Sequence, residues 1–242
     1  MSSIAQLENF SFHNSFYNLK DKLYQHVLRR TEKYLQKADE VRNGIKTPEE
    51  LKAHVDKIRE NFIREIGGIP YDPTLPLNAK TTGYTEEENH TIENVIFESR
   101  SGIFVTASLY IPKKRKTPCG AVLFQCGHAQ EGRLYAQYQR VARIIAMSGV
   151  IVLLQDPMGQ GERKSYFEPS VQRQIVDNEH QYAGNQCHLI GDSIVRYFIS
   201  DAMRGIDYLI SRPEVDDKKI GLTGSSGGGT MTTLMKIGRA HV

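Results

Sequence analysis

The 242-residue chain has no tryptophan, only three cysteines and no long hydrophobic run. Cys119, Cys126 and Cys187 are an odd number without metal-ligand spacing, so we expect neither a disulfide framework nor a bound metal. No segment approaches the ~18 apolar residues that a membrane span needs. Residues 1–8 lack the basic patch and apolar stretch of a secretory signal. These absences predict a reduced, cytoplasmic protein without a cofactor.

An excess of one charge sign is missing as well. Lys and Arg number 31 against 28 Asp and Glu, a formal net charge of +3, whereas nucleic-acid binders concentrate basic charge on one face. The single dense basic run, residues 113–116, lies between two expected strands and is typical of a solvated loop. We therefore expect neither nucleic acid nor a membrane as a partner, and no oligomeric state is indicated.

The first third of the chain has the hydrophobic spacing of helices. One helix is expected at about 16–42, and a second begins at Thr47, where Pro48 suits the first helical position and Glu50 closes a capping box. Residues 70–88 contain several prolines and are expected to form a connecting loop. Residues 1–88 are thus predicted to be a helical N-terminal extension with a linker.

From His90 the pattern changes to alternating strands and helices. A hairpin is expected first, with its turn at Ser101-Gly102. Strands are then expected at the apolar runs 121–124, 150–154 and 219–223, with helices between them at 134–147 and 189–210. Strands that alternate with helices form a parallel sheet covered on both faces. The fold class is therefore predicted to be α/β, a mostly parallel sheet with a leading antiparallel hairpin.

The last expected strand runs into a G-x-S-x-G pattern centred on Ser226. Such an elbow lifts a serine on a strained turn between a strand and a helix. Gly224 and Gly228 remove the Cβ atoms that would collide there. Ser225 does not fit the frame, because Thr223 stands two residues before it. A phosphate-binding loop would carry a lysine that this segment lacks, so the pattern predicts Ser226 as a catalytic nucleophile.

From about His90 to Met235 the chain resembles the α/β-hydrolase fold, and within it the bacterial acetyl xylan esterase-like proteins. The resemblance rests on the elbow and on three further motifs, which are Gln125-Cys126-Gly127-His128, residues 156–163 and residues 212–216. The usual elbow of that family has a bulkier residue where this chain has Gly227. The resemblance implies a serine carboxylic-ester hydrolase. Its substrates would be small-molecule esters or acetylated oligosaccharides, deacetylated through an acyl-enzyme.

The same resemblance implies an oxyanion hole. One donor is expected to be the backbone N–H of Gly227, and the second is expected near His128 and Ala129, in the loop after the first parallel strand. His128 is not expected to be the catalytic base, because the superfamily order is serine, acid, histidine. Its ring is expected to line the pocket or brace the loop, and His180 is expected on the pocket wall or the surface. Asp156 is expected to hold the glycine-rich turn that follows it.

A serine nucleophile also needs a base and an acid that orients it, yet only 16 residues follow Ser226. The last six, residues 237–242, match the translation of common sequencing-adapter DNA. We therefore expect residues 237–242 to be a non-native tail and the native chain to continue past Met235. Residues 89–236 are then an incomplete hydrolase core that lacks the later strands, the acid and the histidine. A chain of this length is expected to be inactive by itself.

Two other functions remain open at this point. A serine peptidase of the prolyl-oligopeptidase type uses the same elbow, although no propeller-like repeat precedes the core here. A non-catalytic binding protein with the α/β-hydrolase fold is the second alternative. An acid and a histidine on later loops favour catalysis, and their absence favours binding.

Overall fold

A computed structural model describes residues 19–165 and 178–238. The chain forms two compact units, residues 1–56 and 57–242, which are described separately below. The first unit contains α2 (Leu19–Gly44) and the start of α3 (Pro48–Glu65). The predicted capping box of α3 is confirmed, because the Glu50 N–H donates to Thr47 Oγ1 at 3.1 Å and the Thr47 N–H donates to the Glu50 carboxylate at 3.2 Å.

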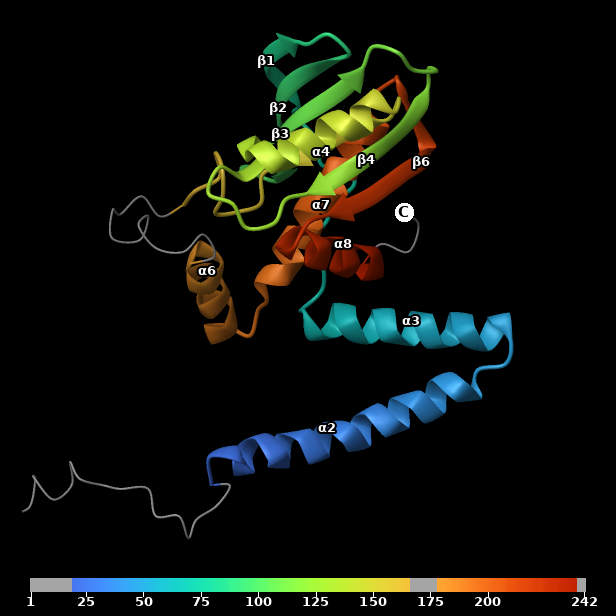
Figure 1. The fold of residues 1–242 in the computed structure, drawn as a ribbon. Coiled ribbons are helices and arrows are strands. Elements are labelled where there is room, and N and C mark those ends of the chain that lie inside the picture. The colour runs from blue at the N-terminus through green and yellow to red at the C-terminus, as the bar shows by residue number, and fades with distance from the viewer. Residues whose placement is uncertain (1–18, 166–177, 239–242) are drawn as a thin grey trace, which may run out of the picture. The chain divides into compact units, whose positions relative to one another are not determined.

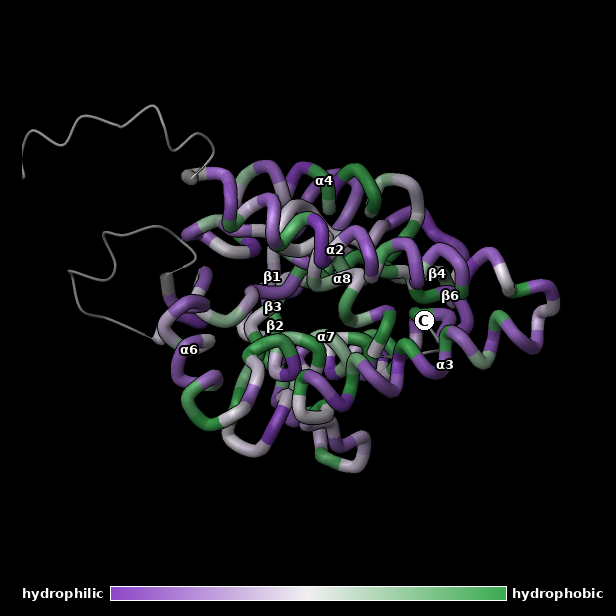
Figure 2. Tube along the Cα trace, turned by 90° about the horizontal axis from the view of Figure 1, so that it is seen from below, coloured by the Kyte–Doolittle hydropathy of each residue, from purple (hydrophilic) through white to green (hydrophobic). Residues whose placement is uncertain are grey.

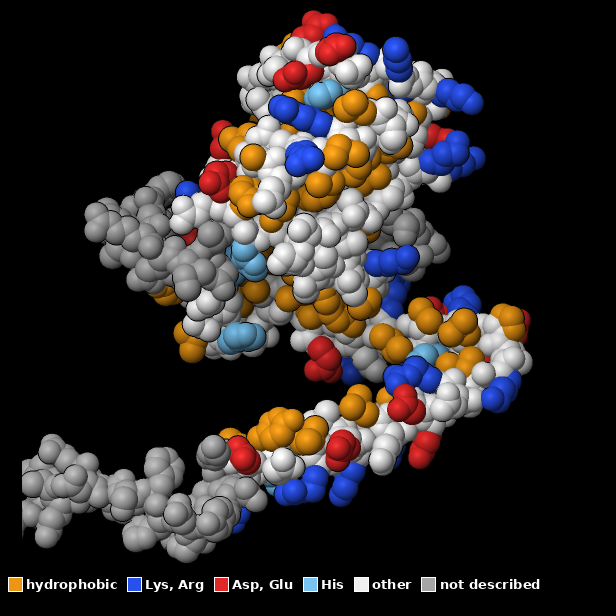
Figure 3. All heavy atoms as spheres, viewed as in Figure 1, with side chains coloured by type: hydrophobic (Ala, Val, Ile, Leu, Met, Phe, Trp, Pro, Cys, Tyr) orange, Lys and Arg blue, Asp and Glu red, His pale blue; other side chains and the backbone are white. Residues whose placement is uncertain are grey.

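Hydrophobic and hydrophilic residues alternate along α2 (Figure 2). Its hydrophobic side chains gather along one side and its lysines and arginines along another (Figure 3). The large exposed members of the hydrophobic side are Leu23, Tyr24, Val27, Tyr34, Leu35 and Val41. This is the amphipathic pattern that the sequence predicts for residues 16–42, of which 16–18 lie outside the described residues.

The second unit is built on a six-stranded sheet in the order β1-β2-β3-β5-β4-β6 (Figure 1). The strands are β1 (Lys80–Glu86), β2 (His90–Arg100), β3 (Ile103–Pro112), β4 (Cys119–Gln125), β5 (Ile151–Gln155) and β6 (Val215–Gly224). β4 pairs in parallel with β5 and β6, while the β1–β2, β2–β3 and β3–β5 pairs are antiparallel. Four strands, β2, β4, β5 and β6, therefore run in one direction. The predicted α/β class with its leading hairpin is confirmed.

Helices cover both faces of this sheet (Figure 1). They are α4 (Ala136–Met147), α7 (Ile194–Ile210) and α8 (Gly227–Gly238). α6 (Asn178–Leu189) packs on α7 instead, and a short 3-10 turn at Gly132–Leu134 precedes α4. α4 packs on one face over a core that includes Phe124 and Leu154. α7 and α8 pack on the other face, over Leu123 and Leu153. Side chains of β4 and β5 thus point alternately into two cores, which explains why both strands read as continuous apolar runs.

Two sequence expectations were wrong. Residues 70–88 contain β1 instead of only a loop, because a polar, mostly exposed edge strand has none of the hydrophobic alternation that marks a strand. The helix expected at 189–210 is divided, since α6 ends at Leu189 and α7 starts at Ile194 after Ser193 caps it. Gly191 lies between them with φ of +71°, which interrupts the helical backbone.

The carboxyl ends of the three parallel strands meet at one edge. Gln125 at the end of β4 is in register with Gln155 of β5 and with Gly224 of β6. The loops that follow these strands are therefore neighbours, which brings the glycine-rich motifs of the sequence together. Nowhere in the described ranges does a helix combine the length and the apolar character needed to cross a membrane.

Candidate active site

Ser226 occupies a tight turn between β6 and α8, and its side chain is exposed. Its backbone has φ of +53°, a region that non-glycine residues rarely adopt because their Cβ atom crowds the backbone. The turn is closed by the Gly228 N–H, which donates to the Ser225 carbonyl at 2.8 Å. Such strain persists only where the surroundings hold it, and it is typical of functional residues.

Two of the glycines around Ser226, Gly224 and Gly228, are sterically required. A Cβ atom at Gly228 would overlap the carbonyl oxygen of Gln125, and one at Gly224 would overlap the carbonyl oxygen of Gly228. At Gly229, by contrast, a Cβ atom would make only an ordinary contact of 3.6 Å with the Gly224 carbonyl. The two positions that the elbow pattern specifies are therefore those at which the backbone of β4 and the start of α8 leave no room.

The loop after β4 passes directly beside Ser226. A Cβ atom at Gly127 would lie 3.1 Å from the Ser226 Cβ and 2.8 Å from the Tyr138 hydroxyl oxygen, and would overlap the Ser225 carbonyl. Only glycine allows this approach. The Gln125-Cys126-Gly127-His128 motif thus brings the expected oxyanion-hole loop into contact with the elbow.

Gln160 lies in the loop after β5 and fixes the conformation of the loop after β4, which contains Gly127 and His128. Its buried side-chain amide donates to the Gly127 carbonyl at 2.8 Å and to the Ala129 carbonyl at 2.9 Å. A carbonyl and the N–H of the same peptide point in opposite directions. The N–H groups of His128 and Gln130 therefore point away from Gln160. Sequence analysis did not single out this residue; its position inside the Gly159-Gln160-Gly161 turn was the available signal.

Asp156, directly after β5, connects the loop after β4 with β3. Its fully buried carboxylate accepts from the Arg133 backbone N–H at 2.7 Å and from the Thr106 hydroxyl at 2.7 Å, and forms an ion pair with the Arg133 guanidinium. The Glu162 N–H of the following turn also donates to this carboxylate, at 3.5 Å. The expectation for Asp156 is therefore confirmed in part: it contacts the following turn, and it also holds the continuation of the loop after β4 through Arg133.

His128 and His180 form a hydrogen-bonded pair next to the elbow. His128 Nε2 lies 3.1 Å from His180 Nδ1, and His180 Nε2 lies 2.6 Å from the Met158 carbonyl oxygen. The exposed His128 ring also faces Gly227, where a Cβ atom would lie 3.0 Å from Cε1 and 3.1 Å from Nδ1 of His128. The imidazole thus occupies the space that a side chain at position 227 would need.

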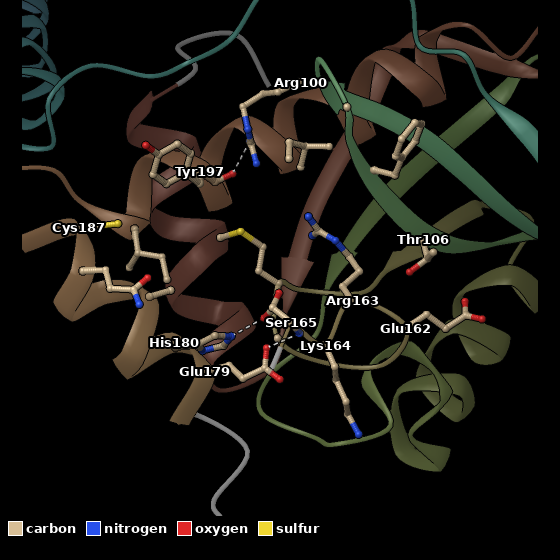
Figure 4. A pocket seen from close by; sticks show the side chains of 18 of the residues that line it. Arg100, Thr106, Glu162, Arg163, Lys164, Ser165, Glu179, His180, Cys187 and Tyr197 are labelled. Carbon is tan, nitrogen blue, oxygen red and sulfur yellow. Dashed lines mark hydrogen bonds between the residues drawn. The ribbon is translucent and has the colours of Figure 1, made fainter. Parts of the chain in front are cut away.

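A cavity of about 780 Å³ lies on the other side of His180. It is lined by the β2–β3 hairpin, the loop after β5, α6 and the start of α7 (Figure 4). Arg100 and Arg163 bind the buried Asp201 carboxylate at 2.9 Å and 2.8 Å, which holds α7 against the hairpin and the loop. Ser226 is not among the described residues that line this cavity, whereas His180 lines it and also contacts His128 of the loop after β4.

Ser226 offers an exposed hydroxyl nucleophile at the elbow. Cys126 lies close by but is buried, and burial raises the pKa of its thiol well above the ordinary value, so that the reactive thiolate is disfavoured. No cluster of three or more His, Cys, Asp or Glu side chains suited to a metal is found within residues 19–165 and 178–238. The arrangement is suited to attack by a serine hydroxyl beside backbone N–H donors.

Comparison with known proteins gives the family. The acetyl xylan esterase (AXE1) family matches residues 68–237. A protein named as a hydrolase, YtaP of Bacillus subtilis (strain 168), is 26% identical over 183 residues, which cover 72% of this chain and 56% of YtaP. This chain therefore spans about half the length of that relative.

Solved structures share the fold. A Bacteroides fragilis protein described as an acetyl xylan esterase has a TM-score of 0.68 at 15% identity, covering 81% of this chain and 53% of its own. Acetyl xylan esterase 1 from Thermoanaerobacterium sp. has a TM-score of 0.50 at 15% identity, covering 76% of this chain and 54% of its own. The sheet and helices are those of α/β-hydrolase-like esterases, and the chain belongs to the acetyl xylan esterase (AXE1) family.

Proposed function

We propose that this protein is a serine carboxylic-ester hydrolase that removes acetyl groups from acetylated sugars or xylan fragments, with Ser226 as the nucleophile. The observation that carries the proposal is the exposed serine held at φ of +53° beside the Gly127 loop. Family membership and the motifs of the resemblance support the acetyl-ester substrate class.

In the proposed reaction, Ser226 Oγ attacks the ester carbonyl carbon while its proton passes to a base. The tetrahedral intermediate expels the sugar as an alcohol, with a proton returned from the base, and leaves an acetyl-serine. Water then attacks this acyl-enzyme and releases acetate. We assign the base and the acid that orients it to positions later in the chain than Ser226, which is the order of the superfamily.

The oxyanion hole is proposed to consist of the backbone N–H groups of Gly227 and His128. Of the two expected loop residues, His128 has the stronger support over Ala129, because Gln160 holds the Gly127 carbonyl on one side and so turns the His128 N–H to the opposite side. Each such donor typically contributes about 3 kcal/mol to stabilising the transition state. Gln160 would then act as a positioning residue for the hole.

The proposal is tested by labelling with a fluorophosphonate and by hydrolysis of p-nitrophenyl acetate, using the complete gene product. Ser226→Ala should abolish labelling and lower kcat by about 10⁴-fold or more. Ser225→Ala is the matched control and should keep labelling, because its side chain lies outside the elbow frame. Labelling that persists in Ser226→Ala would refute the assignment.

A further inference from the structure

The Met158 carbonyl sets the hydrogen-bond polarity of the His128–His180 pair when both rings are neutral. The Met158 carbonyl oxygen only accepts hydrogen bonds, so His180 Nε2, at 2.6 Å, carries the proton. When His180 is neutral its Nδ1 is therefore an acceptor. His128 Nε2, at 3.1 Å from that atom, must then donate. When both rings are neutral, the remaining nitrogen, His128 Nδ1, carries a lone pair.

That lone pair faces the elbow. His128 Nδ1 lies 3.1 Å from the place of a Cβ atom at Gly227, the residue that follows Ser226. No hydrogen-bond partner of Nδ1 is found among the residues that the structure describes; the Nε2 contact with His180 is the hydrogen bond that the ring makes there. An acceptor thus stands beside the proposed oxyanion donor, Gly227 N–H, and none of the described side chains or backbone groups donates to it.

We propose that His128 Nδ1 accepts a hydrogen bond from a free hydroxyl of the substrate, and that His180 is the positioning residue that keeps this nitrogen unprotonated. This inference rests on the proposed function, in which the substrate is an acetyl ester of a sugar. The acetyl group has no hydroxyl, so the hydrogen-bond donor must come from the alcohol part of that ester. The favoured substrates are partly acetylated sugars with a free hydroxyl next to the acetylated one. Fully substituted esters lack the donor and leave the nitrogen unpaired.

Gly227 contributes to the placement of the His128 ring. A larger residue at position 227 would push the His128 ring away, since even a Cβ atom would lie 3.0 Å from the ring. His180 itself is held by the Met158 carbonyl and by an edge-to-face contact with Phe198 at 5.0 Å between ring centroids. The ring is therefore fixed from the α6 and α7 side, while glycine leaves it space on the elbow side.

The test compares two substrates in the complete gene product. One is a methyl xyloside with a single acetyl group and a free neighbouring hydroxyl, and the other is its deoxy analogue, in which hydrogen replaces that hydroxyl. His180→Phe keeps a ring against Phe198 but removes both nitrogens. The ratio of kcat/KM for the two substrates should fall about 5- to 10-fold, the effect of losing one hydrogen bond. The change should appear mainly as a higher KM for the hydroxyl-bearing ester.

Two further variants separate positioning from folding. His180→Asn retains an acceptor near the Nδ1 position and should restore most of the ratio. His188→Phe, at an exposed position on the same helix, should leave the ratio at the wild-type value.

The outcomes are distinct. An unchanged ratio in His180→Phe, with Ser226 still labelled by fluorophosphonate, overturns this inference and leaves the proposed hydrolase function standing. If His128→Phe lowers the rates for both substrates by the same factor, His128 acts on the serine or the oxyanion instead of on the sugar, which also overturns it. Absence of labelling and of hydrolysis for both substrates in the wild-type protein refutes the proposed function itself.

Discussion

At the scale of single residues, the conformation of the elbow depends on the absence of Cβ atoms at its glycines. Positions 224 and 228 lie so close to neighbouring carbonyl oxygens that any Cβ atom would overlap them. The absent side chains of Gly127 and Gly227 matter for a different reason. At Gly127 the absence lets the loop after β4 approach Ser226, and at Gly227 it leaves space for the His128 imidazole. The unfavourable φ of Ser226 is the cost of pointing its hydroxyl outward.

The steric account predicts opposite results for two adjacent glycines. Gly228→Ala should lower the free energy of unfolding by about 3 kcal/mol or more, because the backbone of β4 has to move. Gly229→Ala should be neutral or stabilise by about 0.5–1 kcal/mol, because alanine is the better helix former in α8 and its Cβ has room. Urea unfolding of both variants checks this, and equal effects at the two positions would contradict the steric reading.

At the scale of elements, two loops and two strands are joined through a few buried polar side chains. Asp156, at the end of β5, connects to β3 through Thr106 and to the loop after β4 through Arg133. Arg133 also contacts the Ser108 hydroxyl of β3 at 3.0 Å and is almost completely buried. These links tie the segment that follows His128 to β3 and to the end of β5.

Breaking the buried ion pair should therefore lower the stability of the fold. Arg133→Met leaves the Asp156 charge without its partner and is expected to cost about 3–5 kcal/mol of unfolding free energy. Arg140→Met, at an exposed position on α4, should change stability by less than about 0.5 kcal/mol. Chemical unfolding followed by circular dichroism compares the two; a loss below about 1 kcal/mol for Arg133→Met would show that the pair does not hold these loops.

At the scale of the whole molecule, one buried histidine links stability to pH. His90 begins β2, is 5% exposed, and both of its ring nitrogens lack a hydrogen-bond partner within the described residues. Its ring stacks on Tyr110. Burial lowers the pKa of His90 below its ordinary value of 6.5, and the nearby Arg143 adds to this effect.

A lowered pKa in the folded state means that the unfolded chain binds the proton more readily. His90 therefore has no effect on stability well above pH 6.5, and it destabilises the fold progressively as the pH falls below that value. Urea unfolding between pH 8 and pH 5 should show this loss, and His90→Phe should reduce the slope. His188→Phe, at an exposed site, should keep the wild-type slope; an unchanged slope in His90→Phe would contradict the assignment.

Local patterns predicted much of the fold. The capping box at Thr47, the turn at Ser101-Gly102 and the apolar runs of β4 and β5 each depend on residues close together in sequence, and each was located correctly. β1 was missed because its side chains are polar on both faces. His180 lines the cavity, as expected. Its contact with His128 and the contacts of Gln160 with Gly127 and Ala129 were not predicted, because each joins residues more than 30 positions apart in the sequence.

The sequence alone determined the class of the fold and the position of the strained serine, because periodicity and glycine spacing report the conformation of neighbouring residues. Only the tertiary structure decided which loops meet at that serine. The strand order places β4 between β5 and β6, so that three strand ends align and the side chains of Gln160 and His180 reach the loop that carries His128. Contacts of this kind depend on the path of the whole chain, which no local pattern encodes.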